Sequence, residues 1–402
     1  MTRDLERNLR LIPVHQAFVS AFVWLPVFVL FTRARFDLDG ALLLASLYYL
    51  FVVALEVPSG WMSDRLGRVL TLRVGALGFI GAQACFAVGD DTFWVILLGQ
   101  FLLALGFASV SGTDVTFHYD TVEALGRAHE YTRRQARVSS IGYLVTAASA
   151  LVGGLLGLID VRWAFVASGL VAICQLAVAM QLVEPPRTGQ ASSFGRQLAM
   201  CASYLRSRWL GWIFFYGILL VTLEHVAFSV MQPWLTEVLD RPADDIGSTP
   251  LLAGVIYAIT AFVGAGAARS SAIVEERVGT VVALVGIGAL SAAIVTGMAL
   301  STHVVLLGLV AFRSVQGAAA PVLISGAVAP LTRQEHRATL LSMNSLAGRL
   351  GYGIVLLVIS TGADDDVLGV LGVLAVVAWI MVGVLIVTGW WARRGAEAPA
   401  TA

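Results

Sequence analysis

Charged residues are scarce in this sequence, and one kind of them is missing. Only 13% of the 402 residues are charged and 58% are hydrophobic, whereas about a quarter of the residues of a typical soluble domain are charged. All 26 basic residues are arginine, because the chain contains no lysine. The missing lysine excludes the nucleotide-binding signature GxxxxGK[ST], and the formal net charge of zero provides no bulk attraction to nucleic acid. The composition favours a membrane protein.

Cysteine is also scarce. The three cysteines, Cys85, Cys174 and Cys201, have neither the spacing of a disulfide framework nor that of metal ligands. We therefore expect no metal site and no cofactor. The N-terminal segment leads into a long apolar run without a small-residue cleavage site, so we interpret this run as a retained first membrane span.

Long apolar runs are abundant. A membrane-spanning helix needs about 20 mostly apolar residues, and the length of the runs and their lack of alternation indicate helices rather than barrel strands. Twelve segments qualify as spans: 11–32, 41–62, 70–89, 93–118, 136–159, 162–183, 209–232, 250–268, 279–300, 303–328, 340–361 and 366–390. The sequence thus predicts an all-α membrane protein with twelve transmembrane helices.

The arginines fall in alternate connections between these spans. If the N-terminus lies inside, twenty arginines are in inside segments and four in outside segments, and the outside loops carry aspartate pairs or runs instead. Because positive charge favours the cytoplasmic side, this asymmetry predicts that both termini are inside. We expect a multi-pass protein of the cell's inner, cytoplasmic membrane.

The longest inside connection, 184–208, divides the chain nearly in half. We predict a six-helix bundle over 1–183, a cytoplasmic linker over 184–208 and a second six-helix bundle over 209–402. Within the linker, Phe194, Leu198, Cys201 and Leu205 recur at helical spacing, which favours a helix lying in the membrane interface. A loosely ordered linker is the alternative.

Short matches relate the two halves. Residues 64–67 (DRLG) reappear as 276–279 (ERVG), where Glu276, Arg277 and Gly279 correspond to Asp64, Arg65 and Gly67 at an offset of 212. Arg137 and Arg349 are separated by the same 212 positions. Two six-helix bundles related by a repeat are a transporter architecture.

One polar stretch, GWMSDRLGRV at 60–69, carries a family resemblance. Its Gly60, Asp64, Arg65, Gly67 and Arg68 resemble the signature loop that follows the second span in the major facilitator superfamily. The segments EVPSG and SGTDVTFHYD also resemble a bacterial branch of drug and solute efflux carriers. The resemblance implies a two-bundle carrier that works by alternating access, with a cavity lined mainly by spans 1, 4, 7 and 10.

The chemistry of this loop indicates a gate. Asp64 is able to accept hydrogen bonds from a helix N-terminus or an arginine, and Arg65 and Arg68 are able to form charge pairs across the two bundles. Such pairs would keep the cytoplasmic face closed. Alternatively, the charges fix the topology alone.

Ionisable residues inside spans are costly and indicate function. Glu224 falls near the middle of span 7, and Arg313 falls near the middle of span 10. Gln316 lies one turn from Arg313 on the same helix face. We expect a Glu224–Arg313 pair that binds the coupling proton or substrate; a permanent ion pair between two helices is the alternative.

The N-terminal half offers a second polar set. Asp114 and His118 lie on one helix face near the cytoplasmic end of span 4 and predict a gate or proton relay, with interfacial solvation as the alternative. His15, Gln16 and Gln100 either line the same cavity or form helix-to-helix hydrogen bonds.

Three further charges fall in spans and favour a structural role. We expect Glu56, in span 2, to pair with Arg137 or another arginine on the inside, and Arg349, in span 11, to play a similar part in the other half.

These features favour a secondary active transporter that exports a small, amphipathic organic molecule in exchange for protons. Protons are favoured over sodium because membrane carboxyl groups are available and the sequence indicates no unwound helix. An importer or facilitator of a polar or zwitterionic nutrient is one alternative. A polytopic membrane enzyme that acts on lipid, with Asp114, His118 and Asp120 as its only candidate residues, is another. We expect a monomer in the lipid bilayer, with no nucleic-acid partner.

Overall fold

The computed structural model describes residues 2–33, 35–36, 38–89, 92–186, 193–239, 250–360 and 367–396. Every regular element in these ranges is helical. The N-terminal half contains α1 (Thr2–Val19), α2 (Phe28–Arg33), α3 (Leu38–Leu66), α4 (Arg68–Val88), α5 (Phe93–Val110), α6 (Thr113–Ala124), α7 (Tyr131–Ile159) and α8 (Val161–Ala179). The linker helix is α9 (Phe194–Tyr204), and the C-terminal half contains α10 (Arg208–Leu239), α12 (Pro250–Val278), α13 (Thr280–Leu300), α14 (Leu307–Ala311), α15 (Ser314–Val328), α16 (Arg337–Ser360) and α17 (Val367–Ala396).

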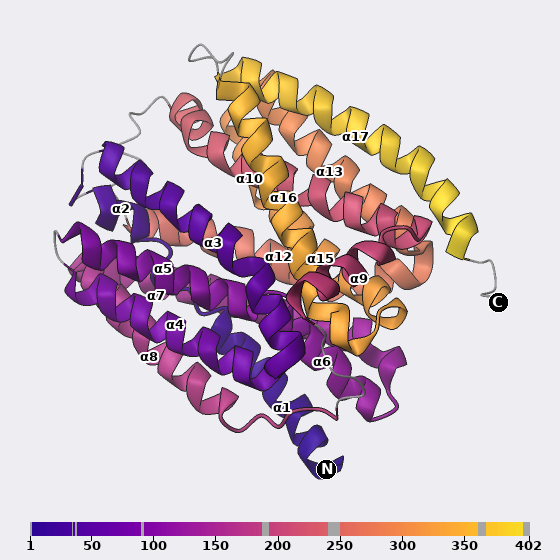
Figure 1. Ribbon diagram of the computed structural model, residues 1–402. Helices are drawn as coiled ribbons and strands as arrows, with labels where there is room; N and C mark the ends of the chain where they lie inside the picture. The colour runs from indigo at the N-terminus through magenta and orange to yellow at the C-terminus, as the bar shows by residue number, and fades with distance from the viewer. Residues whose placement is uncertain are drawn as a thin grey trace.

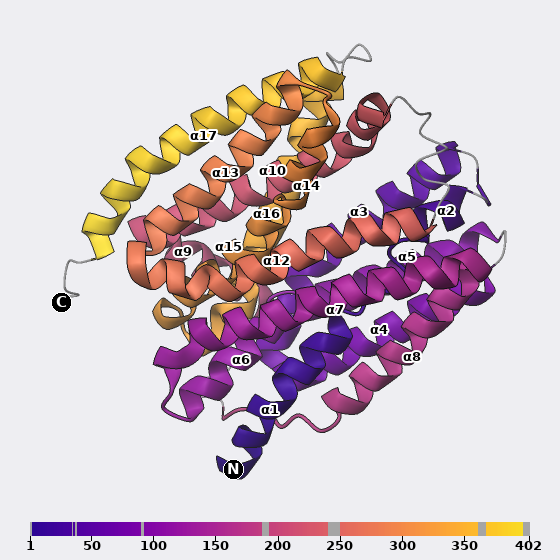
Figure 2. The ribbon, with the colours of Figure 1, turned by 180° about the vertical axis from the view of Figure 1, so that it is seen from behind.

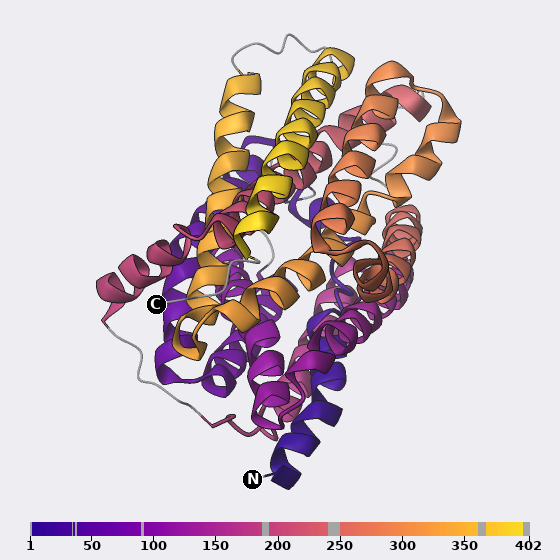
Figure 3. The same cartoon turned by 90° about the vertical axis from the view of Figure 1, so that its right-hand side faces the viewer.

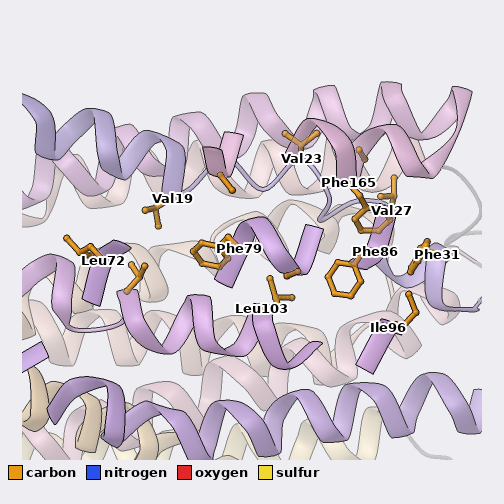
Figure 4. Packing of buried hydrophobic residues seen from close by; sticks show 14 of the residues in the cluster. Val19, Val23, Val27, Phe31, Leu72, Phe79, Phe86, Ile96, Leu103 and Phe165 are labelled. Atoms are coloured by element: carbon orange, nitrogen blue, oxygen red, sulfur yellow. The ribbon is translucent and has the colours of Figure 1, made fainter. Parts of the chain in front are cut away.

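The described helices are long and apolar enough for a membrane protein. Eight of them, counted with their short continuations, meet the length and hydropathy of a membrane span within the described residues. The remaining predicted spans fall on α3, α10, α16 and the pair α1–α2. Each half buries its own apolar core, and in the N-terminal half the rings of Phe31, Phe86 and Phe165 pack against one another between the helices (Figure 4).

Helix boundaries repeat between the halves. The helix α3 covers 38–66 and α12 covers 250–278, while α4 covers 68–88 and α13 covers 280–300. All four boundaries differ by 212 residues, the offset that relates the loop motifs. The glycine between each pair of helices has positive φ, 127° at Gly67 and 82° at Gly279, a conformation that glycine adopts without strain. The boundaries of these two helix pairs and the conformations of their glycines therefore follow the offset of the sequence repeat.

Three predicted spans are interrupted, which corrects the expectation that no helix is unwound. Span 1 leaves the helix between Val19 and Phe28, a stretch that includes Pro26, whose ring removes a backbone donor. Span 4 breaks at Gly112, whose φ of 71° ends the helical path. Span 10 breaks between α14 and α15, where Arg313 bonds to a carbonyl three residues back instead of four.

The two halves meet along two different seams. In the first, α7 and α12 run side by side (Figure 2), from the Arg133–Glu276 ion pair to the contact of Gly154 with Pro250. In the second, α3 and α16 converge toward the lower right of Figure 1 and diverge toward the opposite end. The N-terminus lies at the lower end in the side view as well (Figure 3).

We call the end that holds the loops around Arg68, Arg134 and Arg337 the arginine-rich end. The halves therefore touch along the whole α7–α12 seam, but the α3–α16 seam is closed at the arginine-rich end.

The α7–α12 seam depends on glycine, which leads to a packing prediction. A Cβ atom on Gly254 would lie 2.5 Å from the carbonyl oxygen of Ala150, whereas one on Gly266 of the same helix would meet nothing within 4 Å. We expect Gly254→Val to lower the free energy of unfolding by about 1–3 kcal/mol, because it overpacks the seam. Thermal unfolding in detergent measures this change.

The matched control is Gly266→Val, which places the same β-branched residue in the same helix but away from the seam. Equal losses of stability in the two variants would contradict the tight packing of α7 on α12.

Candidate functional site

The carboxylate of Asp64 spans the two halves at the arginine-rich end. Asp64 stands near the end of α3, and it accepts hydrogen bonds from the backbone amides of Thr339 at 2.9 Å and Ala338 at 3.3 Å and from the Thr339 hydroxyl. These are the second and third residues of α16, so a side chain of one half caps a helix of the other. A carboxylate at this position satisfies free amides and favours the positive end of the helix dipole.

A chain of buried charges extends from Asp64. Arg68 donates to Asp64 at 2.6 Å and to Asp120 at 3.3 Å, and it also donates to the carbonyl of Gln334 in the other half. Arg337 donates to Asp120 at 2.6 Å and to Glu123 at 2.8 Å, again between the halves. Asp64, Arg68, Asp120 and Arg337 are nearly inaccessible to solvent. Two arginines balance two aspartates there, so no buried charge lacks an opposite charge.

The start of the linker holds the loop from the other side. Glu184 accepts hydrogen bonds from the backbone amides of Arg68 and Val69, both at 2.9 Å, and so caps α4. A Cβ on Gly67 would lie 3.0 Å from the Glu184 carboxylate, so both the positive φ and the close approach require glycine here.

The linker helix α9 docks onto the same cluster. A helix is present in the linker, as predicted, and its buried residues are Gln197 and Cys201. Gln197 donates to Asp64 at 3.0 Å, to the hydroxyl of Thr339 and to the carbonyl of Glu335. Burial raises the pKa of the Cys201 thiol to about 12, and the nearby charge of Asp64 adds to that shift. Cys201 is therefore a neutral group in the closed seam.

Gly60 permits the close approach of the halves, whereas Arg65 lies outside the cluster. A Cβ on Gly60 would lie 2.6 Å from the hydroxyl oxygen of Ser342, so the bare backbone lets α3 touch α16. Arg65 is exposed and its guanidinium stands 5.3 Å from the ring centre of Trp61. Of the two loop arginines expected to pair across the bundles, Arg68 bonds to the other half, whereas the aromatic contact of Arg65 stays on its own helix.

The second-copy loop forms a weaker version of this contact. Glu276 pairs with Arg133 at 2.8 Å across the α7–α12 seam, but both side chains are more than half exposed. Arg277 is exposed, and Gly279 precedes the first residue of α13. An exposed ion pair contributes little to stability, so the copy at 64–68 provides the stronger closure.

Glu56 and Arg349 face each other between the halves. Glu56 is fully buried on α3 and lies 3.9 Å from Arg349 of α16, and its other carboxylate oxygen accepts a hydrogen bond from Ser111 at 2.7 Å. The arginine next to Glu56 is thus Arg349 and not Arg137, which is exposed on α7. The repeat explains the difference, because Arg137 occupies the position in α7 that Arg349 occupies in α16.

A small polar cavity lies inside the N-terminal half. Its lining includes His15, Gln16, Asp114 and Gln135 but not Gln100, which is buried elsewhere on α5. The space for a water centre is about 10 Å³, which is what one water molecule needs. His118 reaches this group through its Nδ1, 2.6 Å from the side-chain oxygen of Gln135.

The remaining contacts of this group are local. Gln16 donates to Ser20 at 2.9 Å, within its own chain segment. Among the residues that the structure describes, no cluster of three His, Cys, Asp or Glu side chains could hold a metal ion.

The predicted central pair is only partly visible. The side chain of Glu224 lies outside the described residues. Arg313 is half-buried at the α14–α15 break and acts electrostatically on Tyr257. Gln316 accepts a hydrogen bond from Ser291 and donates to the carbonyl of Leu220 at 2.6 Å. It therefore ties α15 to α13 and α10.

We call Asp64, Arg68, Asp120 and Arg337, together with the side chains that bond to them, the gate cluster. Several of its members could not be recognised in the sequence. The members without an assigned role in the sequence analysis are Glu123, Glu184, Gln197, Arg337 and Thr339. Of these, Arg337 was considered only as one of the inside arginines that predict the orientation in the membrane. Glu184, which precedes two prolines, carried a weak signal because a proline pair ends a span and fixes the residue before it. Gln197 carried none, because it lies beside the apolar stripe of its helix.

The comparisons agree with this architecture. A family model for the Major Facilitator Superfamily matches residues 16–356. The chain belongs to the Major Facilitator Superfamily. No curated protein matches it.

Solved structures of superfamily transporters share its fold at low sequence identity. The human organic anion transporter MFSD10 is 17% identical with a TM-score of 0.69, and the alignment covers 94% of this chain and 99% of that one. The E. coli fucose:proton symporter is 12% identical with a TM-score of 0.72, covering 98% and 100%. A bacterial homologue of the iron transporter ferroportin, in an outward-facing state, is 15% identical with a TM-score of 0.67, covering 95% and 99%.

The gate cluster yields a direct prediction. Asp64→Asn retains the size of the side chain but removes the charge that holds Arg68 and the first turn of α16. Because removing one partner of a buried pair costs about 3–5 kcal/mol, we expect the arginine-rich end to open. A cysteine placed at Ser342, which is buried against Gly60, would then react at least about tenfold faster with a membrane-impermeant maleimide.

Glu276→Gln is the matched control, because it changes the corresponding residue of the second copy. The reporter is measured in a variant without the native cysteines. An unchanged labelling rate in Asp64→Asn would show that Asp64 does not close this end.

Proposed function

We propose that this protein is a secondary active transporter that exports a small organic molecule by alternating access, with protons as the coupling ion. It acts as a monomer of twelve spans in the cytoplasmic membrane, in a six-plus-six arrangement with both termini in the cytoplasm. The arginine-rich end is then the cytoplasmic end, in line with the preference of positive charge for that side.

The observation that carries this proposal is the closed cytoplasmic end. Buried groups of the two halves bond to one another there. Asp64 of α3 accepts a hydrogen bond from the backbone amide of Thr339 on α16, and Asp120 of α6 accepts one from Arg337. The helices α3 and α16 diverge toward the other end (Figure 1). A structure that is closed at the cytoplasmic end by reversible charge contacts, and whose helices diverge at the other end, corresponds to the outward-facing state of an alternating-access cycle.

The polar groups of the spans support ion coupling. His15, Asp114 and Glu56 are available inside the bundle, and Glu224 and Arg313 remain the predicted pair at the centre of the C-terminal half. The apolar character of the helices around them favours an amphipathic substrate. Arg313, placed at a helix break, would also suit a zwitterionic nutrient, which keeps import as the second candidate.

One observation disfavours the alternative of an enzyme that acts on lipid. Asp120 is bonded to Arg68 and Arg337, and His118 is bonded to Gln135. Asp120 is therefore held in the buried charge cluster, which leaves Asp114 and His118 as the two remaining candidates and does not favour a catalytic site.

The proposal is tested by flux in proteoliposomes. We expect purified protein to move at least one compound of a broad panel of amphipathic cations, anions and zwitterions only while a pH gradient is imposed. Adding that compound should collapse the gradient, and a proton ionophore should abolish the accumulation.

Vesicles with the gradient reversed give the direction of transport. Movement of the compound in the direction opposite to proton flow indicates exchange for protons and therefore export. Movement of the compound in the same direction as proton flow indicates import. Absence of gradient-dependent flux for every compound, with protein that is folded by thermal unfolding, would contradict the proposal.

A further inference from the structure

Glu56 is a buried carboxylate with an incomplete set of partners. Its Oε1 accepts the hydrogen bond from Ser111, whereas its Oε2 and the Nε of Arg349 are both buried without a hydrogen-bond partner among the described residues. The 3.9 Å between Oε2 and Nε is too long for a hydrogen bond. The pair is thus held by charge alone, unlike the fully bonded carboxylate of Asp64.

The location of Glu56 links this pair to the conformational change. Glu56 is on α3 and Arg349 is on α16, so the pair forms only while the two halves are together at this seam. Glu56 lies eight residues above Asp64 on the same helix, about 12 Å further into the membrane. The pair therefore sits on the membrane side of the gate cluster, between that cluster and the end where the helices diverge.

Few other charges act on Glu56. The helix α5, which packs on α3, contains no charged residue, and the arginines of α4, Arg68 and Arg73, stand at its arginine-rich end. Among the described residues, Tyr48 on the same helix is the other titratable group that interacts with Glu56, and the uncharged side chain of Ser345 on α16 favours the ionised carboxylate as a hydrogen-bond donor. In the part of the chain that the structure describes, Arg349 is the opposite charge that acts on Glu56.

We propose that Glu56 is a proton-binding site, and that its protonation releases Arg349 and unlocks the cytoplasmic end. This inference rests on the proposed function. A proton from water adds to Oε2 and gives a neutral carboxylic acid, while Arg349 keeps its charge. A neutral acid is stable in a buried position, and the lost partner leaves only an arginine whose side chain is already 22% exposed. The charge attraction across the seam disappears.

The repeat shows that this device belongs to one seam. The position that corresponds to Glu56 in α12, 212 residues on, is the buried Ala268. The position that corresponds to Arg349 in α7 is the exposed Arg137. Within the described residues, the α7–α12 seam thus has no buried counterpart of this pair. Its Arg133–Glu276 ion pair is exposed, and its interior is packed through Gly154 and Gly254, which do not titrate. Protonation at Glu56 would act on the α3–α16 seam, the one that spreads.

The sign of the effect follows from the geometry. Ionised Glu56 favours the closed cytoplasmic end, and protonated Glu56 favours the open one. A proton that enters from the outside would therefore drive the carrier inward-facing, and its release to the cytoplasm would favour the return.

The experiment measures the opening directly. Spin labels on cysteines at Ala124 and Arg333, two exposed residues of opposite halves, report the separation of the cytoplasmic ends in lipid nanodiscs, in a variant without the native cysteines. We expect the ratio of long to short distances to rise at least about tenfold from pH 8 to pH 5, since one proton changes such a ratio by up to tenfold per pH unit. In Glu56→Gln the ratio should be high at both pH values.

Three further variants separate a titrating group from a structural one. Arg349→Gln should also lose the pH response, whereas Arg137→Gln, its counterpart in the repeat, should keep it. Glu56→Asp, which retains a titratable carboxyl group, should keep a response at a shifted midpoint. If Glu56→Gln does not fold, the comparison of Arg349→Gln with Glu56→Asp still decides.

The outcomes distinguish this inference from the proposed function. A wild-type pH response that persists in Glu56→Gln, or that disappears in Glu224→Gln instead, would overturn the inference and leave a proton-coupled carrier intact. A wild-type protein that opens with pH but moves no compound in the flux assay would contradict the proposed function and not the proton site.

Discussion

The structure depends on one contact, the carboxylate of Asp64 on the first turn of α16. Four donors from the opposite half and the linker, together with Arg68, converge on it. No surface pair could replace it, because the value of the contact comes from burial and from helix amides that otherwise lack partners. The rest of the arginine-rich end follows from this constraint. Glu184 fixes the loop that carries Arg68, and Asp120 pairs with both Arg68 and Arg337. Gln197 attaches the linker helix to Asp64 of one half and to the carbonyl of Glu335 in the other.

The two seams between the halves have different roles in the proposed cycle. The α7–α12 seam is packed backbone to backbone through Gly154 and Gly254, and such a surface suits an axis about which two rigid bodies rock. The α3–α16 seam is polar and charged at one end, with the gate cluster outermost and Glu56 with Arg349 deeper. Polar contacts of this kind have two discrete states, bonded and separated, which is the property that a switch requires.

Much of the fold could be predicted from the sequence, because apolar length, arginine position and the offset of 212 are local signals. The same signals located the loop at 60–69 and gave Asp64 its expected helix-capping role. The partners could not be predicted, because a sequence does not state that Thr339 lies 275 positions away in chain but one hydrogen bond away in space. The breaks at Gly112 and Arg313 were missed since an apolar run has the same composition whether or not its helix is continuous. The pairing of Glu56 was assigned to Arg137 as one choice, and only the relative position of the halves selects Arg349.

The central claim is that the halves must separate at the α3–α16 seam for transport to occur. Cysteines at Gly60 and Ser342, whose Cβ atoms would stand 2.9 Å apart, need a separation larger by about 0.6–0.9 Å to reach disulfide geometry. Transport by this variant, with the native cysteines removed, is measured in proteoliposomes before oxidation, after oxidation and after reduction. The account predicts flux that stops on oxidation and returns on reduction. Equal flux with the disulfide formed would contradict it, because substrate would then cross without any opening of the arginine-rich end at this seam.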